Sequence, residues 1–291
     1  MLASLRTQEL ELHYHDDGPA AGRPVVLLHG WPDAPDTWEP LLQGLHAAGY
    51  RTLRPYLRGF GPTRFLRVDG PRSGQLGAIA SDIVEFIRAV ADQPVFLVGH
   101  DWGARCTYII ASQAPQLLRR CAALSVGYGR GDGLSLRQAR NYWYQWYFNT
   151  PLGEQALAAD RRAFCRYVWQ VWSPGWRFDD AAFERTAAAF DNPDWLAVTV
   201  HSYRHRWGLA PGDGRYDALE RALSAEPPIR VPTLVLHGAD DACNDLSTSA
   251  GREHHFPAGL RRLVLPGVGH FPQREAPAEV LAAITEWFAA A

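Results

Sequence analysis

Two carboxylates and a histidine lie far apart along the chain, and each follows an apolar run that is typical of a buried strand. Asp101 lies in the stretch GHDWG, His270 lies in GVGHF, and Asp241 lies in HGADD, next to Asp240. The spacing G-x-D-x-G is that of a nucleophile elbow in which a carboxylate replaces the usual serine. The order of nucleophile, acid and histidine along the chain suits a covalent hydrolytic triad. Asp241 has the expected H-G-x-x-D spacing, and Asp240 is the alternative acid.

A carboxylate nucleophile narrows the chemistry that such a triad can perform. Attack on an ester or amide would give a high-energy anhydride, whereas attack on an epoxide or on a carbon–halogen bond gives an ordinary alkyl ester. Water can then hydrolyse that ester and regenerate the carboxylate. We therefore expect Asp101 to attack and His270, oriented by Asp241, to activate the water. The backbone N–H groups of Trp31 and Trp102 would hold the oxyanion.

Short strands alternating with helices must position these side chains. Apolar runs rich in Val, Leu and Ile predict buried strands at 25–30, 95–100, 121–126, 233–238 and 261–267. Apolar residues at helical spacing predict helices through Ile79, Ile83, Ile87 and Val90, and through Val280, Ile284 and Trp287. This alternation indicates an α/β fold with a mostly parallel sheet covered by helices on both faces.

The alternation stops between residues 127 and 228, where the sequence is helical, aromatic and rich in Arg. We interpret this segment as a helical cap (lid) inserted into a core domain formed by residues 1–126 and 229–291. The carboxyl ends of the strands, where open α/β sheets hold their ligands, should lie beneath it.

Five stretches together carry a resemblance to a known family: HGWPDAPDTW, LRGFGPT, GHDWGA, HGADD and GVGHFPQREAP. They resemble the branch of the α/β-hydrolase superfamily that contains epoxide hydrolases and haloalkane dehalogenases. The resemblance implies an α/β-hydrolase fold with a mostly parallel eight-stranded sheet and an inserted cap. It also implies a cis bond before Pro32, in the turn that follows the early strand.

The two enzyme classes of this branch differ in their leaving groups. An opening epoxide releases an alkoxide, which needs a proton donor such as a tyrosine, whereas a departing halide needs only N–H donors. The segment NYWYQWYF is similar to an epoxide hydrolase pattern that assigns Tyr144 as this donor, and HSYRHRW similarly assigns Tyr203. We therefore expect an epoxide hydrolase that converts an apolar or aryl epoxide to a vicinal diol. The alternative is a haloalkane or haloacid dehalogenase that uses the same triad.

The substrate pocket is expected to include four further residues, which are Pro32, Trp143, Gln145 and Phe271. A third reading is a ligand-binding protein that keeps the fold without turnover, although the complete triad argues against it.

The bulk composition excludes other partners. The 291 residues carry a formal net charge of −2 with no long basic run, which argues against nucleic acid and anionic membrane surfaces. The four cysteines lack C-x-x-C spacing and should be reduced, and His201 and His205 lack a third metal ligand. We expect a cytoplasmic monomer or homodimer that needs no cofactor and no metal, and whose partners are a small-molecule epoxide and water.

Overall fold

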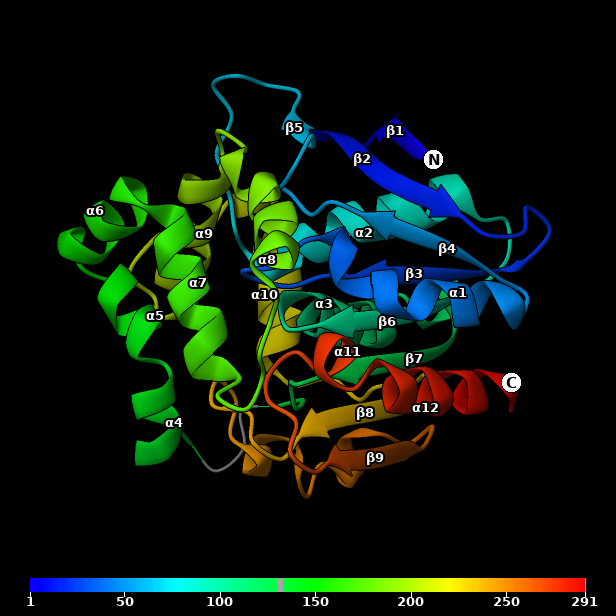
Figure 1. Cartoon of the computed structure of the whole chain (residues 1–291). Coiled ribbons are helices and arrows are strands. Elements are labelled where there is room, and N and C mark those ends of the chain that lie inside the picture. Colours follow the sequence, from blue (N-terminus) through cyan, green and yellow to red (C-terminus); the bar gives the residue numbers. More distant parts are fainter. Residues whose placement is uncertain (130–132, 291) are drawn as a thin grey trace.

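The computed structural model describes residues 1–129 and 133–290, and its centre is one twisted β-sheet (Figure 1). The strands are β1 (Leu2–Arg6), β2 (Leu10–Asp17), β3 (Arg23–Leu28), β4 (Tyr50–Pro55), β5 (Arg64–Phe65), β6 (Val95–His100), β7 (Leu118–Leu124), β8 (Thr233–Gly238) and β9 (Leu260–Leu265). Eight of them follow the order β1-β2-β4-β3-β6-β7-β8-β9, and the two-residue β5 pairs with β2 as a ninth. All neighbours from β4 to β9 are parallel, which confirms the mostly parallel sheet.

The expected strand positions hold, with shifts at some ends. β6 and β8 have the expected bounds, while β3, β7 and β9 end two residues earlier than expected. β7 ends at Leu124 because Ser125 has a φ of +64°, which no extended strand adopts. Gly267 has a φ of +72° and likewise lies outside β9. The strands β1, β2 and β4 did not stand out as apolar runs, because β1 and β2 are only partly buried and β4 contains two arginines.

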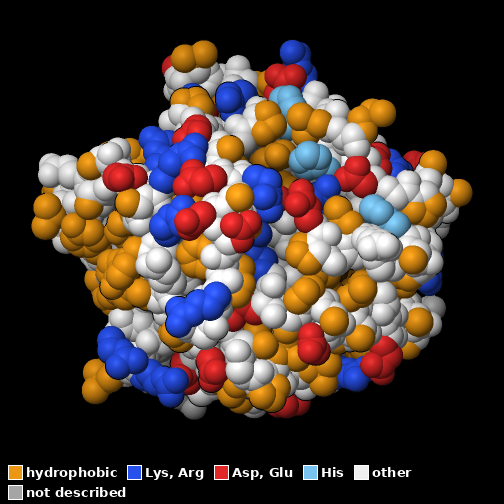
Figure 2. Space-filling model, in the orientation of Figure 1, with side chains coloured by type: hydrophobic (Ala, Val, Ile, Leu, Met, Phe, Trp, Pro, Cys, Tyr) orange, Lys and Arg blue, Asp and Glu red, His pale blue; other side chains and the backbone are white. Residues whose placement is uncertain are grey.

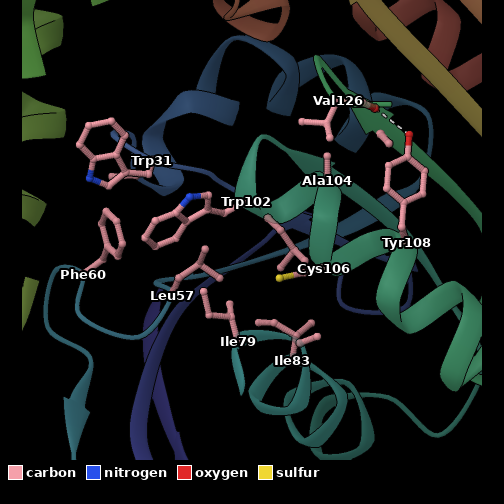
Figure 3. Close-up of a cluster of buried hydrophobic side chains, with 14 of the residues drawn as sticks. Trp31, Leu57, Phe60, Ile79, Ile83, Trp102, Ala104, Cys106, Tyr108 and Val126 are labelled. Atoms are coloured by element: carbon pink, nitrogen blue, oxygen red, sulfur yellow. Dashed lines mark hydrogen bonds between the residues drawn. The ribbon is translucent and has the colours of Figure 1, made fainter. Parts of the chain in front are cut away.

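Helices cover both faces of the sheet, as expected. Alternate side chains of a strand point to opposite faces, so Val25 and Leu27 of β3 pack with one set of helices and Val26 and Leu28 pack with the other. The first set is α1 (Glu39–Ala47) and α12 (Pro277–Ala289), and the second is α2 (Leu76–Val90) and α3 (Trp102–Gln113). Figure 3 shows side chains of α2 directed toward Cys106 of α3, in the core beneath the elbow.

Among the described residues of the inserted segment the regular secondary structure is helical, and none of them forms a strand. Its helices are α4 (Leu136–Asn141), α5 (Trp143–Phe148), α6 (Pro151–Ala159), α7 (Arg161–Trp172), α8 (Asp180–Ala187), α9 (Trp195–Arg206) and α10 (Asp217–Ser224). Four begin at a side-chain N-cap that accepts a backbone N–H, provided by Ser135, Thr150, Asp160 and Asp179. In Figure 1 most of them lie beyond the ends to which the arrows of β8 and β9 point. Residues 130–132 of the expected cap and residue 291 of the expected core lie outside the described residues.

The remaining elements are short. They are α11 (Pro272–Glu275) and 3-10 helices at Pro35–Trp38, Pro115–Leu117, Ala188–Asp191, Gly214–Tyr216, Leu246–Ser249 and Glu253–His255.

Within the described chain, no helix combines the length and apolar character that crossing a bilayer would require. Acidic and basic side chains alternate over α7 and α8 (Figure 2), where Arg162 and Arg166 pair with Glu184. All four cysteines are free and buried.

Candidate active site

The turn between β6 and α3 carries Asp101 in a conformation that few side chains adopt. Asp101 has a φ of +51° and a ψ of −112°. The glycines on either side allow this turn to pack tightly. A Cβ on Gly99 would lie 2.1 Å from the carbonyl oxygen of Gly103, and a Cβ on Gly103 would lie 2.3 Å from that of Leu28. The G-x-D-x-G spacing is thus a steric requirement of the elbow.

The Asp101 carboxylate is buried, with only 5% of the residue exposed. Its Oδ1 accepts a hydrogen bond of 3.0 Å from the backbone N–H of Trp31. Trp102 is the first residue of α3, so its N–H has no acceptor within the helix. This N–H lies at the N-terminal end of α3, next to Asp101. Burial alone would raise the pKa of Asp101, but His270 and the Trp31 N–H outweigh it and lower the pKa to about 2. Asp101 is therefore ionised at neutral pH.

His270 lies between the two carboxylates that the sequence predicted. Its Nδ1 is 2.9 Å from Asp241 Oδ2 and 3.1 Å from Oδ1, and its Nε2 is 3.8 Å from Asp101 Oδ2. The last distance is an ion-pair distance and is too long for a hydrogen bond. Among the described residues Nε2 has no hydrogen-bond partner. Asp240 is exposed, so the structure brings Asp241 and not Asp240 to the histidine.

Several donors converge on Asp241. Its Oδ1 accepts the backbone N–H groups of Cys243 at 2.8 Å and Asn244 at 2.9 Å, and His237 Nε2 lies 3.4 Å from Oδ2. Burial would raise the pKa of Asp241, but His270 and His237 hold it below its usual range. The sequence analysis missed His237, although it is the histidine of the H-G-x-x-D spacing.

The two carboxylates control the charge of His270. Burial would lower the pKa of this imidazole, but Asp241 and Asp101 raise it to about 10. The ring therefore carries a proton while both carboxylates are ionised. It can act as a base at neutral pH only after one of these negative charges has been removed.

A hydrogen-bonded clamp holds the loop that carries His270. The hydroxyl of Ser173, at the end of α7, accepts the His270 N–H at 2.8 Å and donates to Glu275 Oε1 at 2.6 Å. Glu275 also accepts the N–H groups of Gly269 at 2.8 Å and Phe271 at 2.9 Å. The sequence analysis missed this clamp, since only the short distance of Glu275 from His270 along the chain hinted at it.

Tyr144 of α5 and Tyr203 of α9 meet above the elbow, with ring centroids 5.2 Å apart. The Tyr203 hydroxyl accepts a hydrogen bond of 3.2 Å from Trp102 Nε1, and the Tyr144 hydroxyl accepts one of 2.8 Å from Gln145 Nε2. Burial, together with the charge of Asp101, raises the pKa of both phenols well above the ordinary value. Both phenols therefore keep their protons at physiological pH and can donate them.

Aromatic rings wall the space around the triad. Trp31 stacks on Tyr144 at 5.6 Å, and Trp172 contacts the His270 ring edge-on at 4.8 Å. The bond between Trp31 and Pro32 is cis, as the resemblance implied. Phe271 packs against the His270 ring at 5.1 Å. These rings leave little water around Asp101, which strengthens electrostatic interactions within the site.

The two other expected pocket residues lie in different surroundings. Gln145 is buried and joins Tyr144 to Trp207, whose Nε1 donates to Gln145 Oε1 at 2.9 Å. Trp143 is half-buried, and its ring contacts are with residues of the inserted helices: Tyr144, Tyr147, Phe164 and Tyr167. Its place in the pocket stays a prediction.

His201 uses both ring nitrogens within the protein. Nδ1 accepts the Gly74 N–H at 3.0 Å, and Nε2 lies 3.0 Å from the Pro211 carbonyl oxygen. Within the described ranges, no three acidic, His or Cys side chains are grouped as metal ligands.

Comparison with known proteins places the chain in a class defined by its fold. Residues 23–277 match the α/β hydrolase fold family, to which the chain belongs. The chain is 38% identical to a candidate epoxide hydrolase of known structure from Klebsiella pneumoniae subsp. pneumoniae, over 98% of this chain and 96% of that chain, with a TM-score of 0.93. It is 26% identical to "Epoxide hydrolase" of Caballeronia sordidicola, over 95% of this chain and 90% of the relative. It is 27% identical to "Epoxide hydrolase A" of Mycobacterium tuberculosis, over 91% of this chain and 90% of the relative. Within the α/β hydrolases the chain therefore belongs to the epoxide hydrolase family.

Proposed function

We propose that the protein is a cofactor-independent epoxide hydrolase that converts an apolar or aryl epoxide to a vicinal diol through an ester on Asp101. The observation that carries the proposal is the arrangement of an ionised, buried Asp101 next to His270 and below two neutral phenols. The names of the relatives support the same activity.

In the first step a carboxylate oxygen of Asp101 attacks one epoxide carbon. Oδ1 is held by the Trp31 N–H, so Oδ2 is the attacking oxygen. A bond forms between Oδ2 and carbon while the carbon–oxygen bond of the epoxide breaks. The alkoxide so produced takes a proton from Tyr144 or Tyr203, whose neutral phenols are available for general-acid catalysis.

In the second step His270 becomes the base. Ester formation removes the negative charge of Asp101, so His270 gives up its proton, which restores the phenol that was deprotonated. The neutral imidazole, oriented by Asp241, then takes a proton from water as the water attacks the ester carbon. The N–H groups of Trp31 and Trp102 stabilise the oxyanion on Oδ1. The bond between Oδ2 and the carboxyl carbon of Asp101 then breaks, and Oδ2 takes the remaining proton of the water and leaves as part of the diol. The carboxylate of Asp101 is thereby regenerated beside a protonated His270.

A single turnover in heavy-oxygen water tests the covalent intermediate. With enzyme in excess over styrene oxide, we expect an unlabelled diol and label in the side chain of Asp101, because the second diol oxygen comes from the carboxylate. A diol that takes its new oxygen directly from the solvent would refute the ester.

A panel of aryl and aliphatic epoxides tests the ring-opening acids in Tyr144→Phe, Tyr203→Phe and the double variant. We expect each single variant to lose activity by about 10- to 100-fold and the double variant to lose more. Tyr147→Phe is the matched control, since Tyr147 lies on the same helix and its ring contacts Trp143 and Phe164. Release of halide from haloalkanes or haloacids with full activity in these variants would favour the dehalogenase, and no turnover of any substrate would favour the ligand-binding protein.

We further propose that residues 127–228 act as the cap and that residues 1–126 and 229–291 form the core. The cap supplies both phenols and the core supplies the triad, so the site is complete only where the two meet.

A further inference from the structure

Asn244 lies three residues after Asp241 and is buried, with 3% of the residue exposed. Each of its polar groups has a partner. The backbone N–H donates to Asp241 Oδ1 at 2.9 Å, and the carbonyl oxygen lies 3.0 Å from His237 Nε2. The side-chain Nδ2 donates to the Ser125 carbonyl oxygen at 2.9 Å, and Oδ1 accepts the hydroxyl of Tyr142 at 2.9 Å. A buried residue with four partners is held in one orientation, and it holds the loop around it in turn.

The partners determine which way the amide of Asn244 points. A carbonyl oxygen can only accept, so the group that faces Ser125 must be the NH2 group and the group that faces Tyr142 must be the oxygen. Burial raises the pKa of Tyr142, so this phenol keeps its proton and donates a hydrogen bond to Asn244. An apolar side chain of similar size could form neither bond.

Ser125 connects Asn244 to the loop that carries the base. Its φ of +64° is unusual for a residue with a side chain and costs free energy. In this conformation its carbonyl oxygen accepts from Asn244, while its hydroxyl donates to the His270 carbonyl oxygen at 2.8 Å. His100 Nε2 lies 2.7 Å from that same oxygen. Asn244 therefore contacts the acid directly and is linked to the base through one residue.

Tyr142 belongs to the inserted segment and lies between α4 and α5, so its bond to Asn244 joins that segment to the loop after β8. Gln138 of α4 adds two bonds to the same loop. Its Nε2 donates to the Cys243 carbonyl oxygen at 2.8 Å, and its Oε1 accepts the Asp245 N–H at 2.7 Å. These two bonds fix the backbone on either side of Asn244, so the inserted segment holds the loop of the acid at three points.

We propose that Asn244 is a positioning residue of the triad, through which Tyr142 of the inserted segment aligns Asp241 with His270. This inference rests on the proposed epoxide hydrolase function and adds that the acid is aligned only while the inserted segment is bonded to the loop after β8. The alignment matters because Asp241 orients the ring of His270, whose Nε2 must take a proton from the water that attacks the ester.

Single-turnover kinetics with styrene oxide test the proposal in Tyr142→Phe and Asn244→Leu, because they separate ester formation from ester hydrolysis. Tyr142→Phe should slow hydrolysis of the ester about 3- to 10-fold, the range that corresponds to one ordinary hydrogen bond. Asn244→Leu loses both side-chain bonds and should slow hydrolysis about 10- to 100-fold. Ester formation should change by less than about twofold, since His270 acts as a base only in the second step. Unchanged hydrolysis in both variants would overturn the proposal.

The double variant shows whether Tyr142 acts through Asn244. In the Asn244→Leu background, Tyr142→Phe should slow hydrolysis by less than about twofold, because the partner of the hydroxyl is already gone. Losses that multiply in the double variant would contradict this route.

Tyr216→Phe is the matched control. The Tyr216 hydroxyl also bonds the inserted segment to another part of the chain, since it donates to Glu9 Oε2 at 2.6 Å, but Glu9 is not a residue of the triad. This variant should stay within about twofold of wild type in both steps. Equal losses in Tyr142→Phe and Tyr216→Phe would show that any bond from the inserted segment has this effect, and would overturn the assignment to Asn244.

Proton NMR tests the alignment without turnover. The proton on His270 Nδ1 lies in a charge-assisted hydrogen bond to Asp241, with 2.9 Å between Nδ1 and Oδ2, and should give a signal far downfield of the amide protons. His270→Gln assigns this signal by removing it. Tyr142→Phe and Asn244→Leu should shift the signal upfield or broaden it by exchange with water, and Tyr216→Phe should leave it unchanged. A signal that is the same in all three variants would overturn the inference.

This measurement also separates the inference from the proposed function. If the enzyme opens no epoxide, the proposed function fails, and the signal of the His270 proton alone decides whether Asn244 aligns the pair. If Asn244→Leu does not fold, Tyr142→Phe decides, because the loss of one oxygen atom leaves the ring in place.

Discussion

Replacing Asp101 by Asn should convert His270 from a strong base to one that titrates near neutral pH. In the wild-type protein Asp101 and Asp241 together raise the pKa of His270 to about 10. The Asn side chain has nearly the shape of Asp, tolerates a positive φ and carries no charge. The variant therefore reproduces the electrostatic state of the proposed ester without its covalent bond.

The distance between the two side chains sets the size of the effect. His270 Nε2 lies 3.8 Å from Asp101 Oδ2. With an effective dielectric constant of about 20, a charge pair at this distance interacts by about 4 kcal/mol, which corresponds to about three pH units. The pKa of His270 should thus fall from about 10 to about 7. Ester formation would by the same reasoning prepare the base just when it is needed.

Nitrogen-15 NMR titration of the imidazole measures this pKa directly, and His270→Gln assigns the resonance. Wild type should titrate near pH 10, and Asp101→Asn about three units lower. Asp240→Asn is the control, because Asp240 is exposed and should leave the titration unchanged. A difference of less than about one unit between wild type and Asp101→Asn would show that the carboxylate does not control the base.

Three further outcomes follow from the site. Asp241→Asn should lower kcat by about 10³- to 10⁴-fold in steady-state assays, whereas Asp240→Asn stays within about twofold of wild type; equal losses would reverse the assignment of the acid. Glu275→Gln should weaken the clamp on His270 and lower the free energy of unfolding, measured in denaturant titrations, by about 1–3 kcal/mol. It should also lower kcat more than it changes KM. An unchanged kcat would show that the clamp does not position His270. Because the pKa of folded His270 lies above its unfolded value of about 6.5 and that of folded Asp101 lies below its unfolded value of about 3.9, stability should be highest between about pH 4 and 6.5. It should fall on both sides, toward pH 10 and toward pH 2, and His270→Gln should remove the alkaline decline.

The sequence predicts the central part of the fold because buried parallel strands need continuous apolar runs. β6 and β8 have the predicted bounds for that reason. Strand ends depend instead on single backbone conformations, such as the positive φ of Ser125, which no apolar pattern records. The outer strands β1 and β2 are half-buried, so their patterns are weaker and were missed.

The residues of the candidate active site also differ in how well the sequence predicts them. Asp101 and His270 lie in motifs whose glycines are required by close packing, and they are recognisable from sequence. The choice of Asp241 over Asp240 requires the structure, because two adjacent aspartates differ only in the direction in which the side chain points. Ser173 belongs to the inserted segment and lies almost a hundred positions before His270, so its hydrogen bond could not be read from local spacing.

The bond from Ser173 has a consequence for how turnover and opening are related. If residues 127–228 act as the cap that we propose, moving the end of α7 away from the core would break the hydrogen bonds that Ser173 forms with His270 and Glu275. Substrate binding and diol release would then require these hydrogen bonds to break, and the imidazole of His270 would lose its alignment while they are broken. Hydrolysis would then take place only while the inserted segment is closed over the core, and the open enzyme would be inactive.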